Sequence, residues 1–362
     1  MNNIPERIKL ARRIRRFSMD ELVQQMREHA VSKMAISKIE RGLMQPSPST
    51  LQAIADACHL PLSFFNQPML DLGELEFRFS QSVTEEQRQQ VMSLASKQLQ
   101  NYFGVQSFLG EPLPFTHPIR DNVLRNYADV EAAVLKLRRK WEIGLQPIHS
   151  VYELLVCYGI HVLEIDLGCD NILGLSTFVN KGTPIIIINT RTHTTTERKR
   201  FTALHEVCHL LFRLRPDDEV HHQAYLAALP SLPYTVTLKR PTEERLCDLF
   251  ASAMLMPEPC VRRRFGQMRT NVSIDELIAT RCLYGNSVAA QIHRLHDLRI
   301  IDDNLYTYFY EVPIKQNRME EGWGQYPIME TADRMPMLEE RMRTELERME
   351  VEHTETCMQS TS

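Results

Sequence analysis

Apolar residues recur at helical spacing through the first part of the chain, residues 5–66. Ile8, Ala11 and Ile14 mark the inner face of a first helix. Cap signals then divide the region into short helices: a capping box at Ser18-Met19-Asp20-Glu21, a cap at Ser32, a glycine stop at Arg41-Gly42 and a proline start at Ser47-Pro48. The pattern predicts an all-helical head of four helices.

Two strand-like segments interrupt a helical pattern further along the chain. Residues 159–165 alternate between apolar and polar side chains, and Pro184 to Asn189 is a β-branched run typical of a buried strand. Helices are predicted at 84–103, within 128–159, at 196–213, at 241–255 and within 273–301, with a loop or small insertion at 214–240. The predicted fold class is therefore α+β and mostly helical, with one small sheet.

These elements suggest five segments along the chain. They are a head at 1–66, a helical linker at 67–127, a domain with the small sheet at 128–260, a C-terminal helical unit at 261–314 and an acidic, partly disordered tail at 315–362. In the tail, Leu338, Met342, Leu346 and Met349 recur at helical spacing. We interpret them as an amphipathic helix, frayed or covered by a partner, followed by disorder.

Charge separates the head from the rest of the chain. The net charge is −4 over 362 residues, but residues 1–66 hold ten Lys and Arg against six Asp and Glu, so the remainder carries −8. A basic head on an acidic body is expected if only the head contacts phosphate. We expect neither a signal peptide nor a membrane helix, since the first residues are charged and no apolar run approaches about 20 residues. The eight scattered cysteines, without a CxxC pair, favour reduced thiols and a cytoplasmic location.

The candidate chemistry begins at His205-Glu206-Val207-Cys208-His209, an HExxH pattern inside a predicted helix. Positions i and i+4 share a helix face, so His205 and His209 can bind one zinc ion together. Glu206 lies about 100° away around the helix and can take a proton from water beside the metal without being a ligand. The pattern indicates a zinc-dependent peptidase site.

The next predicted helix carries Glu244 and Asp248, two carboxylates on one helix face. Glu244 can complete three protein ligands and leave the fourth zinc position open, as catalysis requires. Asp248 can accept the second imidazole N–H of one ligand histidine and so fix its tautomer. The sequence predicts one zinc ion per chain.

Other polar residues near the motif are weaker candidates. His221 and His222 could supply a third nitrogen, but their polar segment favours solvent exposure. Glu243 neighbours Glu244 but has no acidic residue at i+4. Cys208 points away from the two histidine rings on helical geometry, and we interpret it as a packing residue.

Two stretches carry a resemblance to a known family. Arg198 to Leu211 reads RKRFTALHEVCHLL, and Glu244 to Pro257 reads ERLCDLFASAMLMP. Over roughly residues 130–300 the chain resembles the ImmA/IrrE metallopeptidases, in which RF-x-x-AHE-x-x-H-x-L is followed by E-x-x-A-N-x-FA-x-x-LLMP. The resemblance implies a zincin-like domain and a zinc endopeptidase of prokaryotic or phage-encoded regulation, which cuts or antagonises one repressor or antitoxin protein.

The chain departs from that family pattern in three respects. His209 and Glu244 are 35 positions apart, a long gap that residues 214–240 account for as an insertion. Cys247 stands where the family favours Ala, and Asp248 stands where it favours Asn. Neither substitution removes a predicted ligand.

The head resembles the helix-turn-helix domain of the XRE/Cro family through Ile36 to Gly42, Pro46-Ser47 and Leu51 to Ala55. Its third helix is short, with a polar N-terminal face that can enter the major groove of DNA. The candidate DNA-contacting residues are Ser32, Lys33, Met34, Ser37 and Lys38. The helix lacks the first-turn Gln or Arg that usually reads a base edge, and the alternative use of the head is dimerisation or docking of a related repressor.

Three functions are therefore open at the level of the sequence. The first is a DNA-binding regulator with a zinc endopeptidase domain that acts on a repressor-type or antitoxin-type protein and could form a homodimer. The second is a transcriptional regulator with a structural or sensory zinc site, against which the intact Glu206 argues, because such a site needs no base. The third is an antitoxin-like binder that holds a partner through the tail beyond residue 315.

Overall fold

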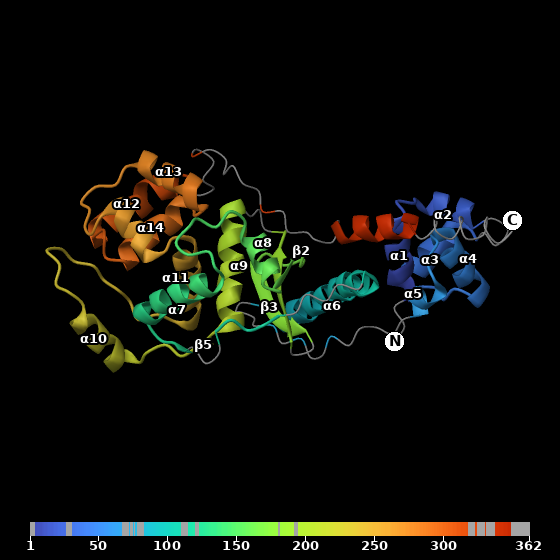
Figure 1. Ribbon diagram of the computed structural model, residues 1–362, viewed down its shortest axis with the longest axis horizontal. Helices are drawn as coiled ribbons and strands as arrows, with labels where there is room; N and C mark the ends of the chain where they lie inside the picture. The colour runs from blue at the N-terminus through green and yellow to red at the C-terminus, as the bar shows by residue number, and fades with distance from the viewer. Residues whose placement is uncertain are drawn as a thin grey trace. The chain divides into compact units, whose positions relative to one another are not determined.

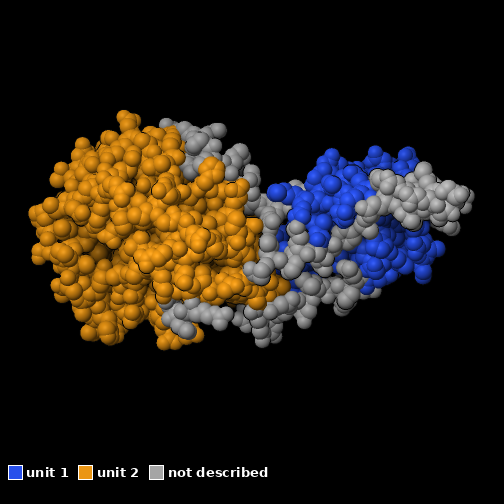
Figure 2. Space-filling model, in the orientation of Figure 1, with its two compact units in different colours: residues 1–73, 92–113, 333–362 blue, residues 74–91, 114–332 orange. Residues whose placement is uncertain are grey.

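The computed structural model describes residues 4–26, 31–66, 72, 75, 77, 83–109, 115–119, 123–179, 182–191, 195–317, 323, 330 and 337–348 (Figure 1). The chain divides into two compact units, coloured separately in Figure 2. Unit 1 comprises residues 1–73, 92–113 and 333–362, and unit 2 comprises residues 74–91 and 114–332. The finer five-segment division stays a prediction.

The head in unit 1 is built from short helices, the four that were predicted and one more that follows them. They are α1 (Ile4–Ile14), α2 (Met19–Gln25), α3 (Lys33–Glu40), α4 (Pro48–Cys58) and α5 (Leu62–Asn66). Ser18 and Glu21 form the predicted capping box, and Ser32 and Ser47 cap α3 and α4 through their side chains. Gly42 has a φ of +71°, which is the left-handed conformation expected of a glycine just past a helix end.

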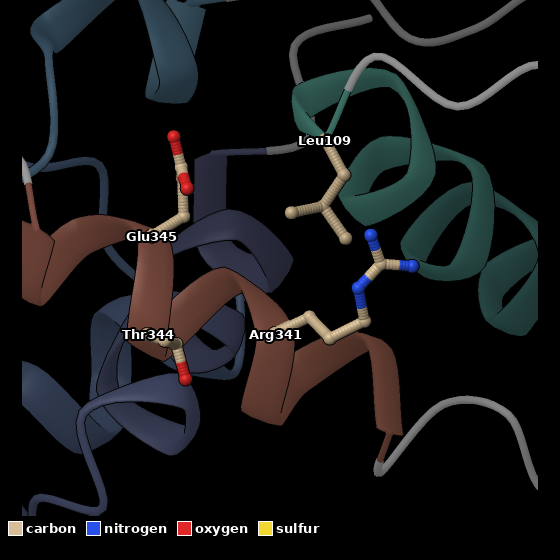
Figure 3. Close-up of a pocket in the computed structure, with 4 residues that line it drawn as sticks. All are labelled: Leu109, Arg341, Thr344 and Glu345. Atoms are coloured by element: carbon tan, nitrogen blue, oxygen red, sulfur yellow. The ribbon is translucent and has the colours of Figure 1, made fainter.

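Two further helices contribute to unit 1. Helix α6 (Glu85–Phe108) enters it from residue 92 onward, and a helix over residues 337–348 lies in the tail. In that tail helix Leu338, Met342 and Leu346 are buried, whereas Met349 lies outside the described residues. A pocket of about 360 Å³ lies beside the tail helix, and its lining residues belong to neither predicted site (Figure 3). The amphipathic pattern of the tail is thus explained by packing within the chain.

Unit 2 contains a three-stranded sheet in the order β2-β4-β3. Strands β2 (His161–Ile165) and β4 (Thr183–Asn189) match the predictions and pair in parallel. Strand β3 (Gly174–Val179) was not predicted and pairs with β4 in antiparallel register, with Ser176 opposite Ile186. Every residue of β4 after Thr183 is buried, as its apolar run indicates.

Helices pack around this sheet to form the main core of unit 2. They are α7 (Tyr127–Lys140), α8 (Val151–Cys157), α9 (Thr196–Leu211) and α11 (Glu243–Leu255). Helix α9 contacts β3 and β4, and α11 packs against α9 and α7. The sheet therefore supports α9, and α9 in turn supports α11, so the two helices with the motif residues meet along one seam.

The remaining helices of unit 2 continue the helical pattern. They are α12 (Glu258–Phe265), α13 (Ile274–Tyr284), α14 (Val288–Asp297), α15 (Asp303–Phe309) and the π-helical turn η2 (Tyr310–Ile314). The short strands β1 (Val123–Leu124) and β5 (Arg213–Leu214) pair in parallel. The observed fold is α+β and mostly helical, as predicted. In the described part of the chain, no helix combines the length and the apolar character needed to span a membrane.

The segment between α9 and α11 is more ordered than a loop. It contains α10 (Glu219–Ala228), which the side chain of Asp218 caps by accepting from the backbone N–H of His221. Its proline-bearing remainder follows α10 up to the Thr242 cap of α11. The small insertion stays a prediction, whereas the ten-residue helix α10 was not predicted.

Candidate metal centre

Helix α9 brings the two motif histidines together. The helix begins after Thr195, whose side chain accepts from the backbone N–H of Arg198. His205 and His209 follow one turn apart, and their rings lie 5.0 Å apart between centroids. Their Nε2 atoms are separated by 3.2 Å, so both nitrogens are directed at one point, as helical spacing predicts.

Helix α11 adds a carboxylate at the same point. Glu244 lies in its first turn, with Oε2 3.1 Å from His205 Nε2 and Oε1 3.7 Å from His209 Nε2. A tetrahedral zinc ion with ligands at about 2.0–2.1 Å holds its ligand atoms about 3.3 Å apart. Two imidazole nitrogens and a carboxylate at 3.1–3.7 Å from one another therefore fit such an ion.

The outer nitrogen of each histidine also has a partner. The Nδ1–H of His205 donates to Oδ1 of Asp248 at 2.9 Å, which is the contact predicted for Asp248. The Sγ of Cys247 lies 3.6 Å from Nδ1 of His209. Both contacts orient the rings with Nε2 toward Glu244, because the two nitrogens of an imidazole point in different directions.

Cys247 also belongs to a second donor set, with His205 and His209, whose potential ligand atoms lie within 4.8 Å of one another. This buried thiol faces the Nδ1 edge of His209, whereas Glu244 faces the Nε2 edge. One metal ion at the Nε2 edge cannot also be reached from the Nδ1 edge. The geometry therefore favours Glu244 as third donor and assigns Cys247 to the orientation of His209.

Glu206 is buried and has a partner that the sequence analysis missed. The Oγ of Ser176, on β3, donates to Oε2 of Glu206 at 2.6 Å. The approach of β3 to α9 is close at Gly174, where an added Cβ would lie 2.6 Å from Cγ2 of Thr202. A glycine at that position therefore lets the strand place Ser176 beside the carboxylate.

Contacts at the site shift the protonation of its residues. Burial lowers the pKa of His205, but hydrogen bonds to Asp248 and Glu244 outweigh it and raise that pKa to about 11. Burial also lowers the pKa of His209, but hydrogen bonds with Cys247 and Glu244 outweigh it and raise that pKa to about 9. The hydrogen bonds from the same histidines lower the pKa of Glu244. A cation bound among these groups must displace the protons from the two Nε2 atoms.

The alternative histidines lie apart from the convergent donor atoms. His221 is exposed, as predicted, and its Nδ1 lies 2.7 Å from Oδ1 of Asp218. The predicted exposure of His222 is wrong, because its side chain is buried and its Nε2–H donates to the carbonyl oxygen of Leu238 at 3.1 Å. Its ring also stacks on that of Tyr225. Packing against Leu238 and Tyr225, rather than metal binding, accounts for the burial of His222.

The predicted DNA-contacting residues lie on and just before α3. Ser32 caps the helix by accepting from the backbone N–H of Ala35. Lys33 pairs with Asp20 of α2 at 2.5 Å, Lys38 is exposed and Ser37 is partly exposed. Met34 is 68% exposed, a large value for an apolar side chain in a helix. Ile36 and Ile39 are buried on the opposite side, so the predicted residues share an outward face.

Comparison with known families matches two parts of the chain. Residues 8–65 match the helix-turn-helix family, and residues 156–296 match the peptidase family described as the IrrE N-terminal-like domain. No curated protein matches the chain. The matched ranges include α3 in the first case and both α9 and α11 in the second.

Proposed function

Since a helix-turn-helix domain and an IrrE N-terminal-like domain occur in one chain, we propose that this protein is a DNA-binding regulator with a zinc-dependent endopeptidase site. Its substrate is one specific protein of the repressor or antitoxin type. The observation that carries the proposal is the convergence of His205 Nε2, His209 Nε2 and the Glu244 carboxylate beside a buried Glu206.

In this proposal each residue of the site has a separate role. His205, His209 and Glu244 hold the zinc ion, while Asp248 keeps a proton on Nδ1 of His205. When bound, zinc supplies Lewis acidity, which polarises a peptide carbonyl and lowers the pKa of water. Glu206 accepts the proton of the attacking water on its carboxylate and passes it to the leaving amine. Ser176 holds that carboxylate in place.

The proposal is tested first by metal content. Purified wild-type protein should contain one zinc ion per chain, and Glu244→Ala should contain much less. Full zinc in both proteins would remove Glu244 from the ligand set, and no zinc in the wild type after chelator-free purification would remove the peptidase function. Glu243→Gln serves as the matched control, because it alters the adjacent carboxylate of the same helix turn.

Turnover is tested separately with Glu206→Gln. This variant should keep its zinc and lose cleavage, so proteins with new N-termini in cells that express the wild type, but not the variant, are substrate candidates. The competing function is a regulator with a structural or sensory zinc site, in which Glu206→Gln changes nothing. The Ser176 contact favours the enzyme, because a structural site has no need of an oriented base.

A further inference from the structure

A glutamate carboxylate from residues 315–332, which we call the C-terminal segment, is buried in unit 2. The side chain of Glu330 has no exposed surface, and it accepts from Ser150 Oγ at 2.7 Å, Val151 N at 3.0 Å and Tyr152 N at 3.2 Å. It also pairs with the guanidinium of Arg200, a residue of α9. Glu330 therefore directly contacts α9, the helix that carries His205 and His209, although it lies more than thirty residues beyond the range that matches the peptidase family.

Arg200 joins this carboxylate to the rest of the core. Its side chain has no exposed surface, and it donates to the carbonyl oxygens of His149 at 2.8 Å and Ile148 at 2.6 Å. Arg200 precedes His205 by five residues on the same helix. Both residues belong to one continuously hydrogen-bonded helix, so contacts that hold the backbone at Arg200 also help to hold the backbone that carries His205.

A second buried ion pair acts on the same part of α9. Glu197 and Arg281 form this ion pair, with Oε1 of Glu197 2.6 Å from Nη2 of Arg281, and both side chains are almost fully buried. Arg281, on α13, also donates from Nη1 to the carbonyl oxygen of Trp323 at 3.0 Å. Two residues of the C-terminal segment, Trp323 and Glu330, are thus connected to successive turns of α9, at Glu197 and Arg200.

Buried charge makes these contacts consequential. Removing one partner of a buried ion pair leaves the other charge without compensation, and the surroundings must then rearrange or admit water. Arg200 lies in the first half of α9, so a rearrangement around its guanidinium would act on that part of the helix. The metal ligands lie in the second half of that helix, where a small rotation separates the Nε2 atoms from Glu244.

We propose that Glu330 is a positioning residue of the metal centre: through Arg200 it fixes α9 so that His205 and His209 face Glu244. The inference rests on the proposed metal site and extends it to residues outside the matched domain. The C-terminal segment is then a working part of the peptidase domain rather than only a tail. Glu330 touches neither metal nor substrate, so its effect is indirect.

The full chain with Glu330→Gln tests this inference, and Glu311→Gln is its control. Glu311 is an exposed glutamate of η2 that pairs with Lys315. The first readout is the visible spectrum and dissociation constant of Co²⁺, which replaces zinc and reports tetrahedral coordination. Glu330→Gln should weaken Co²⁺ binding by up to about tenfold, the lower end of the range for groups that contact a metal ligand directly, because Glu330 acts through Arg200. The measurement is made at a temperature where circular dichroism shows a folded protein, so global destabilisation alone does not produce it.

The second readout is hydrogen exchange of the α9 amides in metal-free protein, which should be about tenfold faster in Glu330→Gln than in the control. Equal Co²⁺ binding and equal exchange in the two variants would overturn the inference. If the wild type binds no Co²⁺, the proposed function fails, and exchange alone still decides the role of Glu330. If Glu330→Gln does not fold, Glu330→Asp replaces it. The α9 amides of Glu330→Asp should exchange faster than those of the control. Co²⁺ binding and exchange equal to those of the control would refute the role.

Discussion

Ser176 on β3 donates a hydrogen bond of 2.6 Å to Oε2 of Glu206 on α9. The contact joins the antiparallel edge of the sheet to the helix of the HExxH motif. It fixes a buried carboxylate whose role, in the proposed reaction, is to accept and return a proton. The sheet is therefore part of the site as well as a support beneath it.

Ser176→Ala should lower the cleavage rate without removing the metal. Hydrogen bonds to charged groups contribute about 1.5–3 kcal/mol, so we expect a loss of roughly tenfold to hundredfold in kcat. The rate is measured on a substrate identified through the Glu206→Gln comparison, with zinc content measured in parallel. A variant that loses its zinc would show instead that Ser176 maintains the ligand set.

Asp248→Ala should weaken metal binding about tenfold to hundredfold, because Nδ1 of His205 loses its acceptor. Asp248→Asn should bind more tightly than Asp248→Ala, since its amide oxygen can still accept from Nδ1. A competitive zinc titration with a fluorescent chelator gives the order of affinities. The interpretation fails if all three proteins, wild type included, bind zinc equally well.

Local periodicity made the core of the site predictable. His205, His209, Glu244 and Asp248 lie on two helices whose spacing of three to four residues already determines which side chains share a face. The missing step was the meeting of the two helices, which the family resemblance supplied. The head was predictable for the same reason, because the caps at Ser18, Ser32 and Ser47 are signals within a few residues.

Contacts between distant segments were not predictable in this way. Ser176 lies on a strand of alternating burial, where Leu175, Thr177 and Val179 are inside, and this alternation was the signal that could have revealed it. Glu330 offers no such signal, because its partner lies 130 positions away. The burial of His222 likewise depends on the chain returning at Leu238.

Gly174→Ala should destabilise the protein by about 1–3 kcal/mol, the usual cost of overpacking. The new methyl group would lie 2.6 Å from Cγ2 of Thr202 and 3.3 Å from the carbonyl oxygen of Ile187, so strand or helix must move. Urea unfolding measures the loss. Thr202→Ser removes the nearer methyl group, so the double variant should recover part of the stability, and no recovery would locate the strain elsewhere.

His293 should make unit 2 sensitive to acid. Burial and nearby Arg245 lower its pKa to about 4, and the hydroxyl of Tyr306 lies 3.0 Å from its Nδ1. The folded state therefore binds fewer protons than the unfolded state between pH 6.5 and 4, so its stability is complete above pH 6.5 and falls toward pH 4. Unfolding free energies across this range should fall by about 1–3 kcal/mol more in the wild type than in His293→Gln. Parallel curves would exclude His293 as the cause.

If α3 lies against the phosphate backbone, Lys38→Ala should weaken binding to DNA of any base sequence. Each phosphate contact adds about 0.9 to the slope of log K against log salt concentration, so the variant should lose about that amount. Fluorescence anisotropy with a DNA duplex at several salt concentrations gives the slope. Lys9→Ala, in α1, removes the same charge from another exposed position of the head and is the matched control. Because both variants change the net charge equally, a larger effect at Lys38 assigns the DNA-binding face to α3, and equal effects would indicate only a general attraction between a basic head and DNA.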